Sequence, residues 1–204
     1  YELRNDPRLS TLLVDINGQY KGVRFGDPVV NHELYGREVT SAFKGPDENG
    51  GQPAALFKSP TSPTVLMGSF ESLFLQAEAT QRGWISASAN ELYNKAIQAS
   101  FDYMEVPPGE LDTYLEGDLV TYDGTLERII EQKWLALNGI SSIEAWNDYR
   151  RLGIPDIPNS LLAPTAQARP LRLMYPETER MTNDEEASKQ GNDLVTEAKI
   201  WWDK

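Results

Sequence analysis

Three groups of side chains in this 204-residue chain carry atoms that catalyse reactions or bind metals in other proteins. His32 is the only histidine, and no Gly-x-Ser-x-Gly elbow accompanies it, so we interpret it as a loop side chain or a ligand hydrogen bond. The acidic turn at residues 47–51 lacks the spaced ligands of an EF-hand loop. Glu71 and Glu78 fall two helical turns apart, about 10 Å, which is wider than glycosidase acid pairs. We therefore expect no catalytic residue, no metal and no cofactor.

The composition argues against several other functions. Nineteen basic residues against 31 acidic ones give a net charge of −12, and no cluster of Lys and Arg suits nucleic acid or an anionic membrane. The chain has no cysteine, so it cannot form a disulfide, a thiolate metal site or a catalytic thiol. No Walker loop or dinucleotide fingerprint is present. No apolar run approaches the about 20 residues of a membrane helix.

Apolar residues at helical spacing predict a pair of helices in the middle of the chain. One helix is expected at residues 65–82 and the next at 88–104, where Ser88 and Glu91 form a capping box. The connection between them is so short that the two helices should pack antiparallel. Four side chains should be buried between this pair and a third helix at 126–139: Phe70, Phe74, Tyr93 and Ile97.

Residues 126–155 predict two further helices. The first has an apolar face and an outward face, and Asn138-Gly139 ends it. The second is capped by Ser141 or Ser142 and stopped by Gly153 and Pro155. The expected apolar face comprises Leu126, Ile129, Ile130, Trp134 and Leu137, with Glu127, Glu131 and Lys133 pointing away.

Four residues of this stretch are interpreted as structural. Trp134 and Trp146 fall inside periodic helices, so we expect them to pack in the core rather than to bind ligand. Arg150 and Arg151 should support the junction, one of them largely buried and paired with a carboxylate or several carbonyls.

The remaining sequence is less regular. Residues 1–63 are rich in Gly and Pro and predict mostly loop with a few short strands, of which residues 12–14 are the best candidate. A short helix is expected at 110–116, and Thr182 with Glu185 should form a capping box that opens an acidic helix. The chain is thus predicted to be one mainly α domain with a loop-rich segment, 1–63, and a helical region, 64–204.

Two neighbouring segments match a family signature. Residues 132–137 read Gln-Lys-Trp-Leu-Ala-Leu, and residues 144–155 read Glu-Ala-Trp-Asn-Asp-Tyr-Arg-Arg-Leu-Gly-Ile-Pro. Together they closely resemble the C-terminal signature of SusD/RagB proteins. Other matching segments follow in chain order: 5–9, 70–79, 82–84, 93–101, 175–179 and 201–203. The resemblance is to the C-terminal part of that family only, so we expect the chain to be a piece of a larger protein.

This resemblance implies a fold and a function. The fold would be an α/α superhelix of TPR-like helical pairs, and the spacing of Ala77, Ala89 and Ala96 around Tyr93 echoes the TPR pattern. The protein would be a non-enzymatic lipoprotein at the cell surface, anchored in the outer membrane through a cysteine upstream of this chain. It would capture a nutrient, mostly glycan, and deliver it to a SusC-like TonB-dependent transporter. The upstream part of the same protein would be its other partner.

A glycan site of this kind needs aromatic rings held at a surface, with amides and carboxylates nearby for the hydroxyl groups. Binding residues tend to gather on loops, and the helical tryptophans are assigned to packing. The expected site therefore lies in residues 1–63, or else wholly in the upstream part. The candidates are Tyr20, Phe25 and Tyr35, with Asn31 and His32 as polar neighbours. The alternative is that these rings only pin a long loop onto the helices.

Three other functions stay open at this point. One is a peptide-binding protein of the SusD/RagB type, and another is a helical-repeat scaffold that binds a second protein. A hydrolase is disfavoured by the resemblance and by the absence of a credible acid/base pair. A deep cleft with an isolated pair of carboxylates would favour it again.

Overall fold

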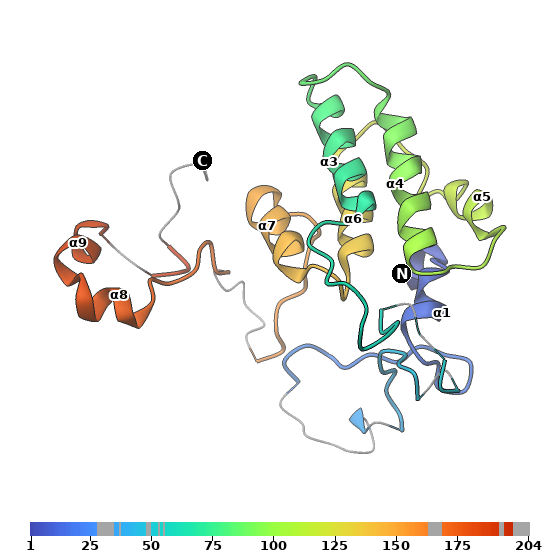
Figure 1. Ribbon diagram of the computed structural model, residues 1–204, viewed down its shortest axis with the longest axis horizontal. Helices are drawn as coiled ribbons and strands as arrows, with labels where there is room; N and C mark the ends of the chain where they lie inside the picture. The colour runs from blue at the N-terminus through green and yellow to red at the C-terminus, as the bar shows by residue number, and fades with distance from the viewer. Residues whose placement is uncertain are drawn as a thin grey trace.

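The computed structural model describes residues 1–27, 35, 36, 38–47, 50–52, 54, 56–162, 169–191 and 194–197. The helices in this part are η1 (Glu2–Arg4), α1 (Arg8–Leu12), α3 (Ser69–Gln81), α4 (Ala89–Tyr103), α5 (Glu110–Leu115), α6 (Leu126–Leu137), α7 (Ser142–Leu152), α8 (Glu177–Thr182) and α9 (Asp184–Lys189). Figure 1 shows α3 to α7 gathered together, with the loop-rich N-terminal segment below them and α8 and α9 to one side. The predicted mainly α fold is confirmed.

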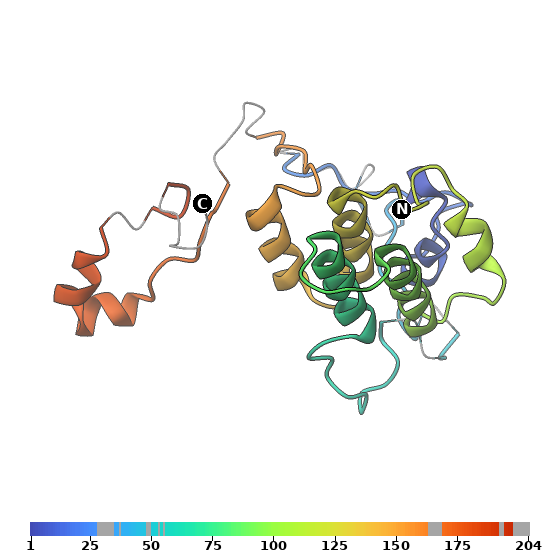
Figure 2. The same ribbon diagram turned by 90° about the horizontal axis from the view of Figure 1, so that it is seen from above.

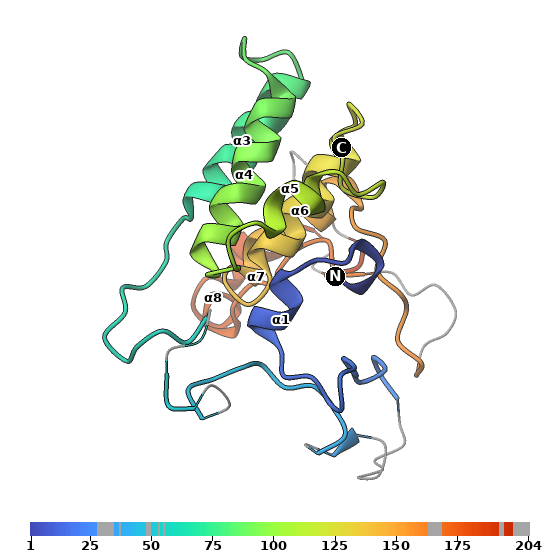
Figure 3. The same ribbon diagram turned by 90° about the vertical axis from the view of Figure 1, so that its right-hand side faces the viewer.

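The predicted helix pair forms as an antiparallel hairpin. Figure 1 shows α3 and α4 side by side, joined at one end, and Figure 3 shows the same pair edge-on. Ser88 caps α4, because its hydroxyl accepts a hydrogen bond from the Glu91 amide at 3.3 Å. The start of α3 lies at Ser69 rather than near residue 65, and Leu66 is outside the helix and 93% exposed.

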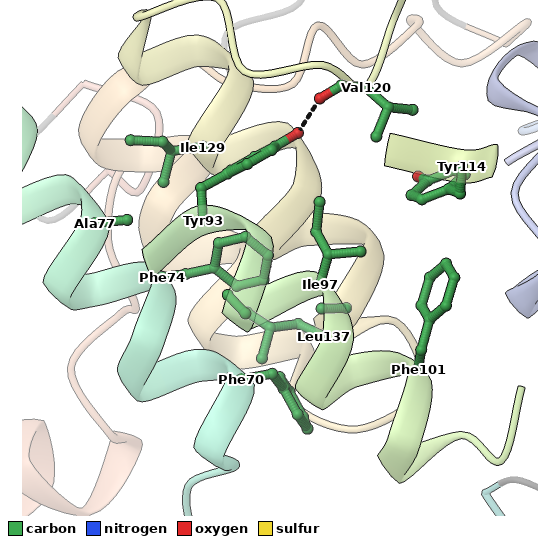
Figure 4. Close-up of a cluster of buried hydrophobic side chains, with 12 residues drawn as sticks. Phe70, Phe74, Ala77, Tyr93, Ile97, Phe101, Tyr114, Val120, Ile129 and Leu137 are labelled. Carbon is green, nitrogen blue, oxygen red and sulfur yellow. Dashed lines mark hydrogen bonds between the residues drawn. The ribbon is translucent and has the colours of Figure 1, made fainter. Parts of the chain in front are cut away.

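The core lies between this hairpin and α6. Phe70, Phe74, Tyr93 and Ile97 are all buried, as the periodicity predicted, and Figure 4 shows them interleaved with side chains of α6. The Tyr93 hydroxyl donates to the Val120 carbonyl, so its one polar group is satisfied. Burying each of these side chains contributes about 1.5–3 kcal/mol, which makes this cluster the main source of stability.

Helix α6 is central, and this overturns two predictions. It packs against α3, α4 and α7, so it is buried on most sides rather than on one face. Lys133, predicted to point away, is 2% exposed, and its ammonium lies 2.8 Å from the Asp148 carboxylate. Trp134, predicted to be core, is 39% exposed. The helix has only one narrow open side, and Trp134 occupies it.

Helix α7 ends as its sequence indicates. Gly153 has φ +70°, a conformation that costs glycine little, and its amide donates to the Tyr149 carbonyl at 2.7 Å. Ser141 occupies the N-cap position, but its side chain makes no capping hydrogen bond.

The strand predicted at residues 12–14 does not form, and a short helix ends at its first residue. Leu12 closes α1, and Leu13 makes only an isolated bridge with Phe43. Leu9 and Leu12 are buried one turn apart, so α1 packs as an amphipathic turn of helix. In the described residues, two isolated bridges are the only β pairing.

The acidic C-terminal helix is present without its predicted capping box. Thr182 belongs to the preceding helix α8, and its hydroxyl donates to the Thr178 carbonyl at 2.7 Å. Asn183 is the N-cap of α9 and makes no side-chain cap bond. Seen from above, in Figure 2, α8 and α9 lie apart from the rest of the helices.

Candidate functional site

The loop-rich segment holds the three predicted aromatic candidates. Phe25 is 65% exposed, and Tyr20 and Tyr35 are partly exposed. The Tyr35 hydroxyl donates to the Asp27 carboxylate, and this hydrogen bond raises the pKa of Tyr35. Tyr35 therefore stays a neutral phenol at physiological pH. The other two candidates, residues 31 and 32, lie outside the described residues.

A second loop fixes the backbone beside Phe25. The Phe25 carbonyl accepts a hydrogen bond from the Leu161 amide at 3.0 Å. Gly26 has φ +71°, and a Cβ there would lie 1.8 Å from the Ser160 hydroxyl oxygen. Only glycine fits this close approach, so the two loops meet at a defined point although more than 130 residues separate them. The exposed ring of Phe25 projects from a positioned backbone.

The structure adds an aromatic residue that the sequence interpretation missed. Phe57 is 52% exposed and lines a pocket of about 680 Å³ in the same loop-rich segment, together with Leu56 and Lys58. The pocket is within the about 300–1,000 Å³ typical of small-ligand sites. The signal in the sequence was the same as for Phe25, an aromatic residue among Gly and Pro.

The tryptophans assigned to the core are both accessible. Trp134 lines a small apolar pocket of about 240 Å³ with Trp146 and Tyr149. Trp146 is partly exposed, and the Arg150 guanidinium lies 4.2 Å from its ring centroid. The assignment of Trp134 to core packing was therefore wrong.

The two neighbouring arginines make the predicted kinds of contact but are less buried than predicted. Arg151 donates to both Glu78 and Asp148, while its own side chain is 34% exposed. Arg150 is also partly exposed and donates to the Leu171 carbonyl at 2.7 Å and to Asn147 at 3.0 Å. Neither is largely buried, so the prediction that one of them would be was wrong.

Glu71 and Glu78, the two carboxylates considered as an acid/base pair, have opposite environments. Both are 4% exposed. Burial raises the pKa of Glu71, and nearby Lys133 only partly offsets it. Burial would also raise the pKa of Glu78, but hydrogen bonds from Arg151 and Arg82 outweigh it and hold that pKa below its usual value. Glu78 is a structural anion that joins α3 to α7.

These pKa shifts predict opposite effects of two similar substitutions. Glu78→Gln should lower the free energy of unfolding at pH 7 by about 1–3 kcal/mol, because it weakens charged hydrogen bonds. A lowered pKa contributes stability above the unfolded value and loses it as pH falls, so the difference from wild type should shrink below about pH 4. Glu71→Gln should raise stability at pH 7 by about 0.5–2 kcal/mol. That gain should vanish in acid, where Glu71 is already protonated.

The measurement is urea unfolding of the two variants and the wild type between pH 3.5 and pH 7.5. Each variant is the control of the other, because the chemical change is identical and the helix is the same. A loss of stability at pH 7 in both variants would contradict the assigned environments.

The described residues show neither a metal site nor a membrane-spanning helix. Within them, no group of three His, Cys, Asp or Glu side chains is placed to hold a metal ion. Nor does any helix in this part of the chain combine the length and apolar character that crossing a bilayer requires.

Comparison with known proteins gives a consistent result. Residues 2–176 match the SusD-like family model, which is described as starch-binding and associating with the outer membrane. A SusD homologue from Bacteroides fragilis matches with a TM-score of 0.78 and 28% identity, over 100% of this chain and 49% of that one. No curated protein matches.

Other solved structures are nearly as similar. A chitin-binding protein matches with a TM-score of 0.75 and 27% identity, over 99% of this chain and 48% of its own. A SusD homologue from Parabacteroides distasonis matches with a TM-score of 0.72 and 27% identity, over 98% and 44% of the two chains. The chain thus spans about half the length of the structures it matches.

Proposed function

Because the chain belongs to the SusD-like family of starch-binding proteins that associate with the outer membrane, we propose that it captures glycan at the cell surface. The observation that carries the proposal is the family match over residues 2–176. Two of the solved structures it resembles are SusD homologues, and a third is a chitin-binding protein. Capture without chemical conversion fits a chain in which the buried carboxylates of Glu78 and Asp148 pair with cations of other helices.

The loop-rich segment is the proposed ligand surface. Sugar rings present C–H faces that stack on aromatic rings, while their hydroxyl groups need polar partners. Phe25 supplies an exposed ring on a backbone positioned by Leu161, and the Tyr35–Asp27 pair supplies polar groups nearby in sequence. Tyr20 is the third ring of the proposed surface, and Asn31 and His32 remain proposed polar neighbours.

We further propose that the captured glycan passes to a SusC-like TonB-dependent transporter in the same membrane. Support comes from the family description, which places these proteins at the outer membrane. A lipid anchor on an upstream cysteine belongs to the same proposal. So does packing of this chain against an upstream part of the protein, since the matched structures are about twice as long.

Removing the ring of Phe25 is expected to weaken glycan binding about tenfold, equivalent to about 1.4 kcal/mol, because a stacking face is lost. Tyr20→Ala and Tyr35→Ala should weaken it as well. The measurement is isothermal titration calorimetry of the protein with maltoheptaose and chitohexaose. Val23→Ala is the matched control, since Val23 is 60% exposed on the same loop but has no ring.

Two results would count against the proposal. Unchanged affinity in all three aromatic variants, with folding intact by circular dichroism, would remove the loop-rich segment from the site. Absence of binding to any member of a neutral glycan array would overturn glycan capture itself.

A further inference from the structure

A second cleft lies between the C-terminal end of α3 and α7. It has a volume of about 400 Å³, which is within the range of small-ligand sites. Figures 1 and 2 show α7 on the side of α3 away from α4. The loop aromatics Tyr20, Phe25 and Tyr35 do not line it. Its lining includes Leu75, Glu78, Trp84, Glu144, Asn147 and Arg151.

Trp84 is the most unusual residue of this cleft. Its side chain is 70% exposed, whereas tryptophans in folded proteins are highly buried on average. The Arg82 guanidinium lies over the ring, 5.3 Å from its centroid. The Trp84 amide donates to the Ala79 carbonyl at 2.9 Å, which fixes the backbone just after α3. One face of the indole is therefore held by a cation, and the exposed remainder can stack on a ligand.

The floor of the cleft is polar and rigid. Asp148 lies 2.8 Å from the Lys133 ammonium and accepts from Arg151 at 2.7 Å, and Arg151 also donates to Glu78. Lys133, Glu78 and Asp148 are each at most 5% exposed, so this network belongs to the folded frame. Asn147 sits at the rim of the same floor, where Arg150 donates to its side-chain oxygen at 3.0 Å. These groups are oriented before any ligand arrives.

The charges of the cleft indicate the class of ligand. Three carboxylates line it, from Glu78, Glu144 and Asp148, and three cations line it as well, from Lys133, Arg150 and Arg151. A fourth cation, Arg82, lies over the Trp84 ring, and its charge is taken up by an ion pair with Glu78 at 2.8 Å. Cations that are already paired with carboxylates give little electrostatic attraction to an acidic polymer or to a phosphate. Fixed polar groups beside an aromatic face suit an uncharged ligand with both C–H faces and hydroxyl groups.

We propose that this cleft is a second binding site for a neutral pyranose glycan, with a sugar ring stacked on Trp84. Hydroxyl groups of the sugar donate to the Glu144 carboxylate and accept from the side-chain amide of Asn147 at the rim. Leu75 contacts the apolar face of the sugar. The inference rests on the proposed glycan-binding function and adds a site on the helices that is separate from the loop surface. Two sites on one chain raise avidity for a long polymer when both engage it.

The test follows each indole directly by fluorine NMR of protein labelled with 5-fluorotryptophan. The Trp84→Phe variant identifies the Trp84 resonance, because that signal disappears. Adding maltoheptaose or chitohexaose to the wild type should shift the Trp84 resonance until it saturates. Acidic oligogalacturonate of similar length should not shift the Trp84 resonance. The titration itself uses the wild-type sequence, and the variant serves only to assign the Trp84 resonance.

Affinity provides the second measurement. Trp84→Ala should weaken binding about fivefold or more, which is about 1 kcal/mol, and Trp84→Phe should weaken it less because a ring remains. Trp134→Ala is the matched control, since it removes another partly exposed indole that does not line this cleft. Its affinity should stay close to that of the wild type.

The two proposals fail in different ways. If neutral glycans bind and the loop variants weaken them, but the Trp84 resonance stays still and Trp84→Ala binds normally, the cleft is not a glycan site and the proposed function stands. If no neutral glycan binds, both proposals fall. A larger shift with oligogalacturonate than with the neutral sugars would overturn the assignment of a neutral ligand.

Discussion

Replacing Arg8 with alanine is expected to reduce the free energy of unfolding by about 3–5 kcal/mol, the usual cost of breaking a buried ion pair. The Arg8 side chain is fully buried, and its guanidinium donates to Asp6 at 2.9 Å. It also donates to Gln132 at 3.0 Å, to Ser100 at 3.1 Å and to Tyr114 at 3.2 Å. Alanine would leave the buried Asp6 carboxylate without the cation that it pairs with, so the loss exceeds that of a single hydrogen bond.

Urea unfolding of Arg8→Ala and Arg8→Lys measures this effect. Lysine keeps the charge but cannot reproduce the planar fork of donors, so Arg8→Lys should also be clearly destabilised. The matched control is Arg4→Ala, because Arg4 pairs with Glu131 in a more exposed setting, with side chains 16% and 26% exposed. That pair should contribute about 0–1 kcal/mol. Equal losses for Arg8→Ala and Arg4→Ala would contradict the role assigned to burial.

Arg8 also shows what periodicity in the sequence cannot reveal. Its partners Ser100, Tyr114 and Gln132 lie 92 to 124 residues away and come from three different helices. Nothing in the segment around Arg8 indicates that a charged residue there is the centre of the packing. The family resemblance included this segment, but it did not give the contacts.

The helix pair was predictable because its signals are local. Ser88 and Glu91 are three residues apart, and the apolar residues of α3 and α4 repeat at helical spacing, so the sequence alone places both. The same reasoning failed for α6, where it assumed one buried face. Helix α6 is surrounded by three other helices, so Lys133 is buried and its charge is paired with Asp148. Trp134 lies on the side of the helix that faces solvent.

The candidate ligand surface was only partly predictable. The aromatic residues of a Gly- and Pro-rich segment can be named from the sequence, and Phe25 is indeed exposed. Its backbone is positioned by Leu161 and Ser160, and contacts between distant loops leave no periodic signal. Trp84 was passed over as a ligand-binding residue for a related reason. Its exposure depends on how α7 packs beside α3, which only the three-dimensional structure shows.

Replacing Lys133 with methionine is expected to destabilise the protein by about 3–5 kcal/mol. Methionine fills similar space, but it leaves the Asp148 carboxylate without the ammonium that lies 2.8 Å away. Asp148 is 5% exposed, so water cannot replace the lost cation, and the only cation still paired with Asp148 is then Arg151, which Asp148 shares with Glu78. The loss should therefore be far larger than for a surface lysine.

A double-mutant cycle separates the ion pair from simple packing. Urea unfolding is measured for Lys133→Met, Asp148→Asn and the double variant. Because the two groups interact directly, the double variant should lose about 1–3 kcal/mol less than the sum of the single variants.

Lys58→Met is the surface control, since its partner Glu105 is 61% exposed, and this change should cost at most about 1 kcal/mol. Raising the salt concentration should reduce the Lys58 effect and leave the Lys133 effect nearly unchanged, because a buried pair is screened little. Additive losses at Lys133 and Asp148, or equal salt dependence of the two lysines, would show that the pair does not join α6 to α7 as its geometry indicates.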